Sequence, residues 1–251
     1  DAATLTALVG CLDDSDVVVR QRAARSIALV AEAGNEQAIQ NLSACLADSD
    51  AGVRLAAGDA LVKIAGQQAN VRAIAAVCRC IEHEDPSVRS AAVKVLLKLA
   101  PRGNQLMVRA VASRFEHRDA SVRCVAVDTL AKVAERGDES AIVAATSRLE
   151  DDSNNVRHAA VDALTELAER GDGGAIMAVL SCLEDPNAGV RRAAIDAMVA
   201  TTYPGDSRTV RGVGQCLHDD DPDVRQTAHN ALVRLSQHGD ESATQLLLAD
   251  W

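Results

Sequence analysis

The chain has 251 residues and a formal net charge of −10. An acidic balance of this size argues against binding to a nucleic-acid backbone, because that affinity comes from Lys and Arg side chains that neutralise phosphates. No apolar run approaches the roughly 18 residues that a membrane-spanning helix needs. Because the chain begins at Asp1 without a Met, we expect it to be a processed or excised segment of a longer protein.

Seven Val-Arg pairs share one register along the chain, at intervals of 34 or 35 residues. Self-similarity at this period is typical of an array of supersecondary units that share one continuous core. The arginines of the pairs are Arg20, Arg54, Arg89, Arg123, Arg157, Arg191 and Arg225. We therefore expect a single array with repeats at approximately 1–33, 34–67, 68–102, 103–136, 137–170, 171–204 and 205–238, followed by a lone terminal helix at 239–251.

Each repeat is predicted to be a pair of helices joined by a short acidic turn. In the fifth repeat, Ala141, Ala145 and Leu149 follow helical spacing, and Val156 and Leu164 mark a second amphipathic helix after the turn. The one inserted residue lies around Gln67–Asn70, where the usual glycine is absent, so this turn is expected to be looser.

The helix ends carry signals as regular as the core. A good N-cap residue stands four positions before each Val-Arg arginine: Asp16, Asp50, Asp85, Asp119, Ser153, Asn187 and Asp221. Glycine stands where a left-handed residue would end the second helix: Gly34, Gly103, Gly137, Gly171, Gly205 and Gly239. An Asn or Asp directly after each of these glycines is predicted to cap the next first helix.

These features together resemble the HEAT repeat, and especially the shorter HEAT-like repeat of phycobilisome lyases. The resemblance lies in the pattern Asp-x-x-Val-Arg-x-x-Ala-Ala/Val-x-x-Leu, as at 85–96 and 119–130, and it extends over essentially the whole chain. It implies an all-α, right-handed α-solenoid of seven helix pairs plus the terminal helix, related to armadillo arrays. It also implies that the second helices line the inner, concave surface.

The seven arginines invite interpretation as an anion-binding stripe. Each lies in the first turn of its helix, where the macrodipole disfavours a cation, and each is surrounded by carboxylates of the turn. An Asp–Arg ladder between repeats accounts for both facts and resembles the ladder of HEAT repeats. We therefore expect all seven, Arg20, Arg54, Arg89, Arg123, Arg157, Arg191 and Arg225, to be structural.

No catalytic, cofactor-binding or metal-binding constellation is predicted. His83 and His117 share a register, but residues one repeat apart cannot share a metal whose bonds are near 2 Å. Five cysteines also share a register, Cys11, Cys45, Cys80, Cys182 and Cys216. Neighbouring repeats stand about 10 Å apart, too far for disulfides. We expect buried free thiols and an intracellular, reducing compartment, the cytoplasm or an organelle.

The outward face of the second helices is the candidate binding surface. Positions 1, 5, 9 and 12 after each arginine point away from the core at 100° per residue, and positions 3, 7, 10 and 11 point toward it. An acidic patch with little local compensation results. The predicted contact residues are Asp128, Asp162, Glu166, Arg192 and Asp196.

The sequence favours a non-catalytic protein–protein interaction scaffold, a segment or subunit of a larger assembly, whose partner presents a basic segment. Two alternatives stay open. An accessory subunit of a phycobilin or chromophore lyase is suggested by the family resemblance and would need a pigment-sized apolar pocket. A purely architectural array stacking end to end would need exposed apolar surface around Leu5 and Leu8, with Trp251 docking at the other end.

Overall fold

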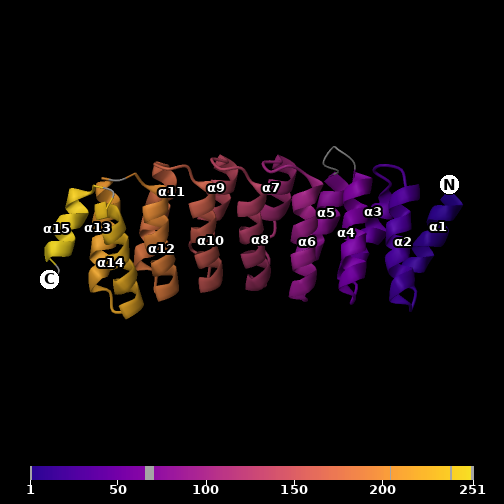
Figure 1. Cartoon of the computed structure of the whole chain (residues 1–251), viewed down its shortest axis with the longest axis horizontal. Helices are drawn as coiled ribbons and strands as arrows, with labels where there is room; N and C mark the ends of the chain where they lie inside the picture. The colour runs from indigo at the N-terminus through magenta and orange to yellow at the C-terminus, as the bar shows by residue number, and fades with distance from the viewer. Residues whose placement is uncertain (1, 66–70, 204, 238, 250–251) are drawn as a thin grey trace. The chain divides into compact units, whose positions relative to one another are not determined.

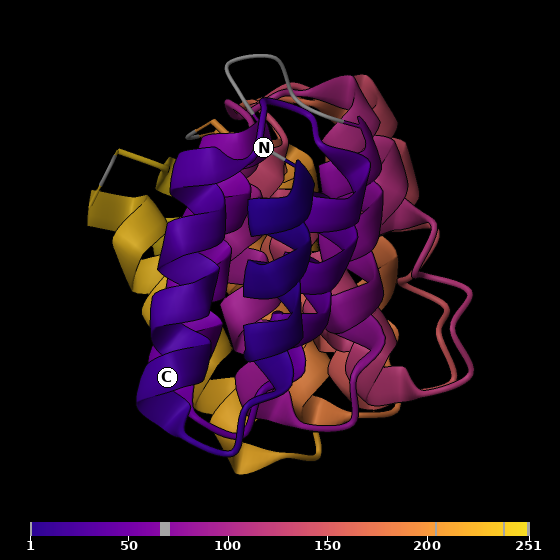
Figure 2. The same ribbon diagram turned by 90° about the vertical axis from the view of Figure 1, so that its right-hand side faces the viewer.

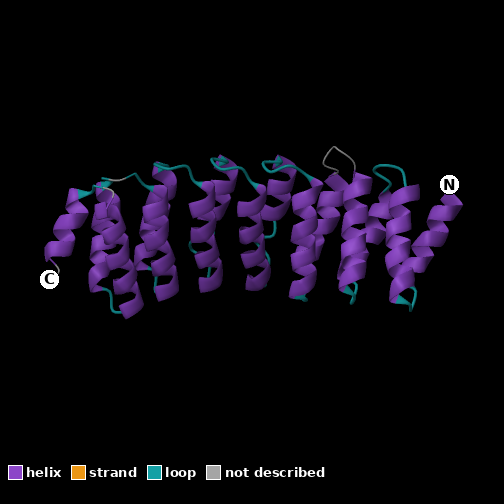
Figure 3. Cartoon of the chain, in the orientation of Figure 1, coloured by secondary structure: helices purple, strands orange, loops and turns teal. Residues whose placement is uncertain are grey.

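The computed structural model describes residues 2–65, 71–203, 205–237 and 239–249. Within these residues it contains fifteen α-helices, five short 3-10 helices and no strand (Figure 3). The predicted loose turn at Gln67–Asn70 and the predicted docking residue Trp251 lie outside the described residues.

The helices alternate between a shorter first helix and a longer second helix (Figure 1). The first helices are α1 (Ala2–Gly10), α3 (Glu36–Ala44), α5 (Val71–Arg79), α7 (Gln105–Ala112), α9 (Glu139–Thr146), α11 (Gly173–Ser181) and α13 (Ser207–Gln215). The second helices are α2 (Val17–Val30), α4 (Ala51–Ala65), α6 (Pro86–Leu99), α8 (Ala120–Val133), α10 (Asn154–Leu167), α12 (Ala188–Thr201) and α14 (Pro222–Gln237). The last helix is α15 (Glu241–Ala249), and 3-10 turns follow the first helix at Cys11–Asp13, Cys45–Ala47, Cys80–Glu82, Cys182–Glu184 and Cys216–His218.

Tertiary contacts divide the chain into two compact units. The N-terminal unit comprises Asp1–Arg118 and Lys132–Ala134, and the C-terminal unit comprises Asp119–Ala131 and Glu135–Trp251. In the N-terminal unit α2, α4 and α6 pack in one layer and α1, α3, α5 and α7 in a second; Figure 2 shows α1 beside α2. In the C-terminal unit α10, α12 and α14 form the corresponding layer. The predicted all-α solenoid is confirmed.

The core follows the helical period of the second helices. The residue seven positions after each Val-Arg arginine is fully buried; Ile27, Leu96 and Leu164 are examples. The residue three positions after each Val-Arg arginine is a buried alanine in every repeat, which lets adjacent helices approach closely. Position 5, predicted to face outward, is exposed in all seven second helices, as at Asp59 and Asn230. The predicted orientation of these helices is confirmed at these positions.

The predicted helix ends are confirmed with one exception. All six glycines have a positive φ, between 76° and 88°, and the Asn or Asp after each accepts a backbone hydrogen bond from the next first helix. The prediction that the Ser153 side chain caps a helix is wrong. Ser153 occupies the N-cap position of α10, but its side chain makes no capping hydrogen bond. The side chains of the other six predicted caps accept one.

Substitution of Gly205 tests whether backbone conformation alone fixes these turns. Its φ is 86° and no atom lies within 4 Å of the place where a Cβ would stand, so Gly205→Ala should destabilise the protein by about 1–2 kcal/mol through left-handed strain. The matched control is Gly173→Ala in the first turn of α11, which is equally open and should be neutral or slightly stabilising. Urea denaturation followed by circular dichroism measures both. Equal stability of the two variants would contradict a conformational role for Gly205.

Candidate binding surface

The five predicted contact residues all lie exposed on second helices. Asp128 is on α8, Asp162 and Glu166 are on α10, and Arg192 and Asp196 are on α12. The structure brings Asp162, Arg192 and Asp196 together around one hollow, whereas Asp128 and Glu166 do not line it. All five thus occupy exposed positions as predicted, and three of them line one hollow.

This hollow, which we call the mixed-charge hollow, lies on the outward face of α10, α12 and α14 and has a volume of about 460 Å³. Each carboxylate has a cationic or titratable neighbour. Asp162 Oδ2 lies 3.1 Å from His158 Nδ1, and Asp196 Oδ1 lies 3.8 Å from Arg234 Nη1. Because these side chains are well exposed and the second separation exceeds a hydrogen bond, the contacts are weak and the carboxylates stay accessible.

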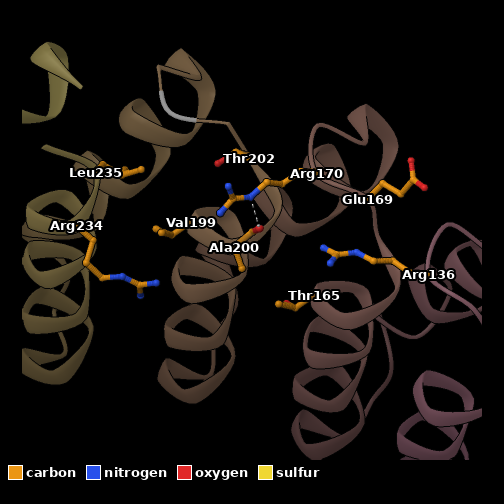
Figure 4. Close-up of a pocket in the computed structure, with 9 residues that line it drawn as sticks. All are labelled: Arg136, Thr165, Glu169, Arg170, Val199, Ala200, Thr202, Arg234 and Leu235. Carbon is orange, nitrogen blue, oxygen red and sulfur yellow. Dashed lines mark hydrogen bonds between the residues drawn. The ribbon is translucent and has the colours of Figure 1, made fainter. Parts of the chain in front are cut away.

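A second hollow, which we call the arginine pocket, adjoins the first at the C-terminal ends of α10 and α12 and has a volume of about 710 Å³ (Figure 4). Arg136, Arg170 and Arg234 line it together with Glu169. The two hollows share Thr165, Ala200 and Arg234. The outward face of the C-terminal unit thus runs without a break from a partly acidic surface to a basic one.

Two of these arginines belong to a second series of contacts between repeats, which the sequence reasoning missed. Arg136 Nε donates to Ala168 O at 2.9 Å and Arg170 Nε to Ala200 O at 3.3 Å. The glycine after each arginine donates its N–H to a carbonyl of the same helix end. Arg102 of the N-terminal unit is tied in the same way to Ala134 O. The sequence feature that could have predicted these contacts is an arginine directly before the turn glycine in successive repeats.

Four of the seven Val-Arg arginines form the predicted ion pairs across repeats, whereas Arg54, Arg89 and Arg225 bind carbonyls of their own turns. Arginine Nε and Nη2 donate to both oxygens of an aspartate 28 residues later, at 2.6–3.0 Å. These ladder pairs are Arg20–Asp48, Arg123–Asp151, Arg157–Asp185 and Arg191–Asp219. Hydrogen bonding to Arg191 holds the pKa of the Asp219 carboxyl below its usual range, against the opposing effect of burial. Planar bidentate pairing of this kind fixes the spacing of neighbouring repeats.

The ladder changes chemistry in the N-terminal unit, where histidine occupies the register of the partner aspartate. The residue 28 positions after Arg89 is His117, and His83 occupies this register opposite Arg54. His83 still does what the aspartate does for its own turn, since its Nδ1 accepts the N–H of Asp85 at 3.0 Å. Arg89 Nε, however, is buried without a hydrogen-bond partner.

The N-terminal unit has an open groove between α4 and α6, with a volume of about 520 Å³. Its lining is mainly apolar, and Leu55 is 61% and Leu97 44% exposed. Arg54, Lys94 and Lys98 stand among these apolar residues, and Lys98 is paired with Asp59 at 2.9 Å. The groove could therefore accept an apolar group that carries negative charge.

All seven cysteines are free thiols. Cys182 and Cys216 are buried, whereas Cys11, Cys45 and Cys80, expected to be buried in the same register, are partly accessible. Burial raises the pKa of the Cys45, Cys78, Cys182 and Cys216 thiols to about 11, which keeps them protonated and unreactive near neutral pH. Within the described residues no group of three or more His, Cys, Asp or Glu side chains could hold a metal ion.

The two ends of the described chain differ in their apolar exposure. Leu5 is only 7% exposed and Leu8 is half-buried, so Leu5 adds little to the apolar surface of α1. Leu248 on α15 is 74% exposed. Among the described residues, no helix combines the length and the apolar character of a membrane span.

Comparison with known proteins agrees with this architecture. The sequence pattern of the family described as HEAT repeats matches residues 5–96, 148–210 and 176–249. The fold is similar to that of YIBA_ECOLI from E. coli, with 20% identity over 87% of this chain and 81% of that one, at a TM-score of 0.56. It is also similar to the complex of CpcE and CpcF of phycocyanin lyase from Nostoc sp. PCC7120, with 20% identity over 64% of this chain and 98% of that one, at a TM-score of 0.54. No curated protein matches the chain in sequence. The chain belongs to the HEAT-repeat family.

Proposed function

We propose that this chain is a non-catalytic protein–protein interaction scaffold, a segment or subunit of a larger protein or assembly. The observation that carries the proposal is the mixed-charge hollow, which lies on an exposed face built from regularly spaced helices. A preformed surface of this kind loses little ordering entropy when a partner binds.

The chemistry of the face favours a partner with a basic segment. Asp162 and Asp196 are exposed carboxylates whose neighbours neutralise them weakly. Glu166 lies one turn beyond Asp162 on α10, and Asp128 is equally exposed on α8. A basic segment along this face would replace the weak pairs by direct ones, while Arg192 would bind an acidic group of the same partner. Such charges act mainly on the association rate and on partner choice.

Charge reversal of the predicted contact residues tests this function. We expect the triple variant Asp128/Asp162/Asp196→Arg to lose, in a pull-down from native lysate, partners that the unmodified chain retains, because like charges would then oppose a basic segment. The matched control is Glu135/Glu184/Asp220→Arg, which reverses three exposed acidic residues elsewhere in the C-terminal unit. If the two variants capture the same proteins, this face is not the binding site.

A second candidate function is that of an accessory subunit of a chromophore lyase. Its support is the apolar groove between α4 and α6, with Arg54 and Lys94 placed to meet an acidic group of a pigment. The similarity to the CpcE and CpcF complex concerns the fold. The same pull-down, performed from a lysate rich in phycobilins, distinguishes this candidate: a coloured eluate that fades in a Leu55/Leu97→Ser variant would favour it over a protein partner.

A further inference from the structure

We propose that the arginine pocket is an oxyanion-binding site, which takes a ligand bearing carboxylate or phosphate groups. The site would work whether or not the neighbouring face also holds a protein. Its lining carries three guanidinium groups against one carboxylate, that of Glu169. This is a marked reversal in a chain whose net charge is −10.

The three guanidinium groups converge on the same space. Figure 4 shows Arg136 and Arg234 extending from opposite sides toward Ala200 and Thr165, with Arg170 between them, while the carboxylate of Glu169 points away. All three arginines are exposed. The carboxylate of Asp196 approaches Arg234 only to 3.8 Å, too far for a hydrogen bond. An anion in the pocket would therefore contact three guanidinium groups, and the carboxylates of the protein would compete with it only weakly for them.

Two of the arginines are held in place by the backbone. The Nε atoms of Arg136 and Arg170 donate to Ala168 O and Ala200 O, so their terminal amino groups remain for a ligand. These carbonyls lie at the negative ends of α10 and α12, and the Nε bonds satisfy acceptors that would otherwise repel an anion. A guanidinium fixed through Nε presents its two Nη groups side by side, which matches two oxygens of a carboxylate or phosphate.

A single small residue opens the pocket. Ala200 occupies the register in which α10 has Glu166 and α14 has Arg234. A methyl group at this position leaves room that a longer side chain would fill. Thr165 Oγ1 donates its proton to Val161 O at 2.9 Å, so its oxygen faces a ligand only as an acceptor. The pocket therefore favours an oxyanion that also carries a hydroxyl or another donor.

The backbone tethers do not by themselves explain this arrangement. Arg102 makes the same Nε bond in the N-terminal unit, yet it lines none of the hollows described above. The pocket in the C-terminal unit needs, in addition, Arg234 from α14 and the small side chain of Ala200. Arg102 therefore serves as an internal control, because its substitution removes a tether but no part of the pocket.

Titration calorimetry at low salt tests the proposal on the intact chain. The probes are citrate and inorganic pyrophosphate as free oxyanions, and an acetylated peptide rich in Asp and Glu as a protein-borne source of carboxylates. We expect saturable binding that weakens roughly tenfold or more in Arg170→Gln and in Arg234→Gln, because each removes charge-assisted hydrogen bonds. Arg102→Gln should bind as the unmodified chain does.

The variant Ala200→Glu provides a test that does not remove an arginine. Its carboxylate would enter the pocket from the chain itself, so we expect ligand binding to be lost while the circular dichroism spectrum is retained. Binding of citrate or pyrophosphate would indicate a small-molecule ligand, and binding of the peptide alone an acidic protein segment. The proposal is overturned if no probe binds saturably, if Arg102→Gln weakens binding as much as Arg170→Gln, or if Ala200→Glu still binds.

Discussion

Replacing Arg157 by alanine is expected to destabilise the protein by about 3–5 kcal/mol, because it leaves a buried carboxylate without its counter-ion. Arg157 Nε and Nη2 donate to Asp185 at 2.6 and 2.9 Å, and the Asp185 side chain is only 7% exposed. Burial raises the pKa of Asp185, but the hydrogen bonds from Arg157 and from the Asn187 N–H, together with the charges of Arg157 and Arg191, outweigh this effect, so the folded-state pKa lies below its usual value. Without Arg157 the largest favourable contribution is lost while the cost of burial remains.

The effect should depend on pH in a defined direction. In the unmodified chain the lowered pKa of Asp185 contributes stability at neutral pH that is lost as the pH falls through that pKa. In Arg157→Ala much of this lowering of the Asp185 pKa should be lost, so less of that stability remains above the pKa of the unfolded chain, about 3.9. The difference between the two proteins should therefore be largest near neutral pH and shrink in acid. Urea denaturation across this pH range measures it.

Arg225→Ala is the matched control. Arg225 occupies the same register on α14, but it is exposed, and the bonds the structure describes for it run to the carbonyls of Asp219 and Asp220. Its loss should cost less than about 1 kcal/mol and show little pH dependence. If Arg157→Ala and Arg225→Ala lower the free energy of unfolding equally, the ladder pair contributes nothing beyond the contacts of its turn. The apolar core would then fix the spacing of the repeats.

The features that depend on backbone conformation and period could be predicted from the sequence. A left-handed residue excludes most side chains, so Gly34 and its equivalents mark each helix end without reference to the rest of the fold. The core positions follow in the same way from 100° per residue. Ser153 shows the limit of such local rules, because a good cap residue makes its bond only if its rotamer points to the helix, and that depends on neighbouring side chains.

The hollows could not be predicted from the sequence, because they arise where small side chains leave space between residues that are distant in the chain. Nothing in the local sequence around Ala200 indicates that its methyl group faces arginines from three different repeats. The shared register of His83 and His117 was visible, yet it was considered only for metal binding, which was excluded. The relation of His117 to Arg89 becomes evident only once the structure shows that the ladder joins residues 28 positions apart.

Replacing His117 by aspartate is expected to stabilise the protein by about 1–3 kcal/mol. Arg89 Nη1 already donates to His83 O and Glu84 O, as Nη1 of Arg20 does to the equivalent carbonyls of its own turn. Its Nε is buried without a hydrogen-bond partner, whereas the equivalent Nε of Arg20 binds Asp48 at 2.8 Å. An aspartate at position 117 would supply that missing acceptor, and Asp48 shows that an aspartate in this register also accepts the N–H of its own turn.

A double-mutant cycle separates this gain from any other effect of removing His117. Thermal and urea denaturation of His117→Asp, Arg89→Ala and the double variant should show that the gain disappears when Arg89 is absent. A gain that persists in the Arg89→Ala background would come from the turn, and no gain in either background would mean that Arg89 reaches an acceptor through water. With the gain confirmed, histidine at this position would be a cost in stability that the chain bears in one repeat, which marks the register of Arg54 and Arg89 as the place where the ladder is weakest.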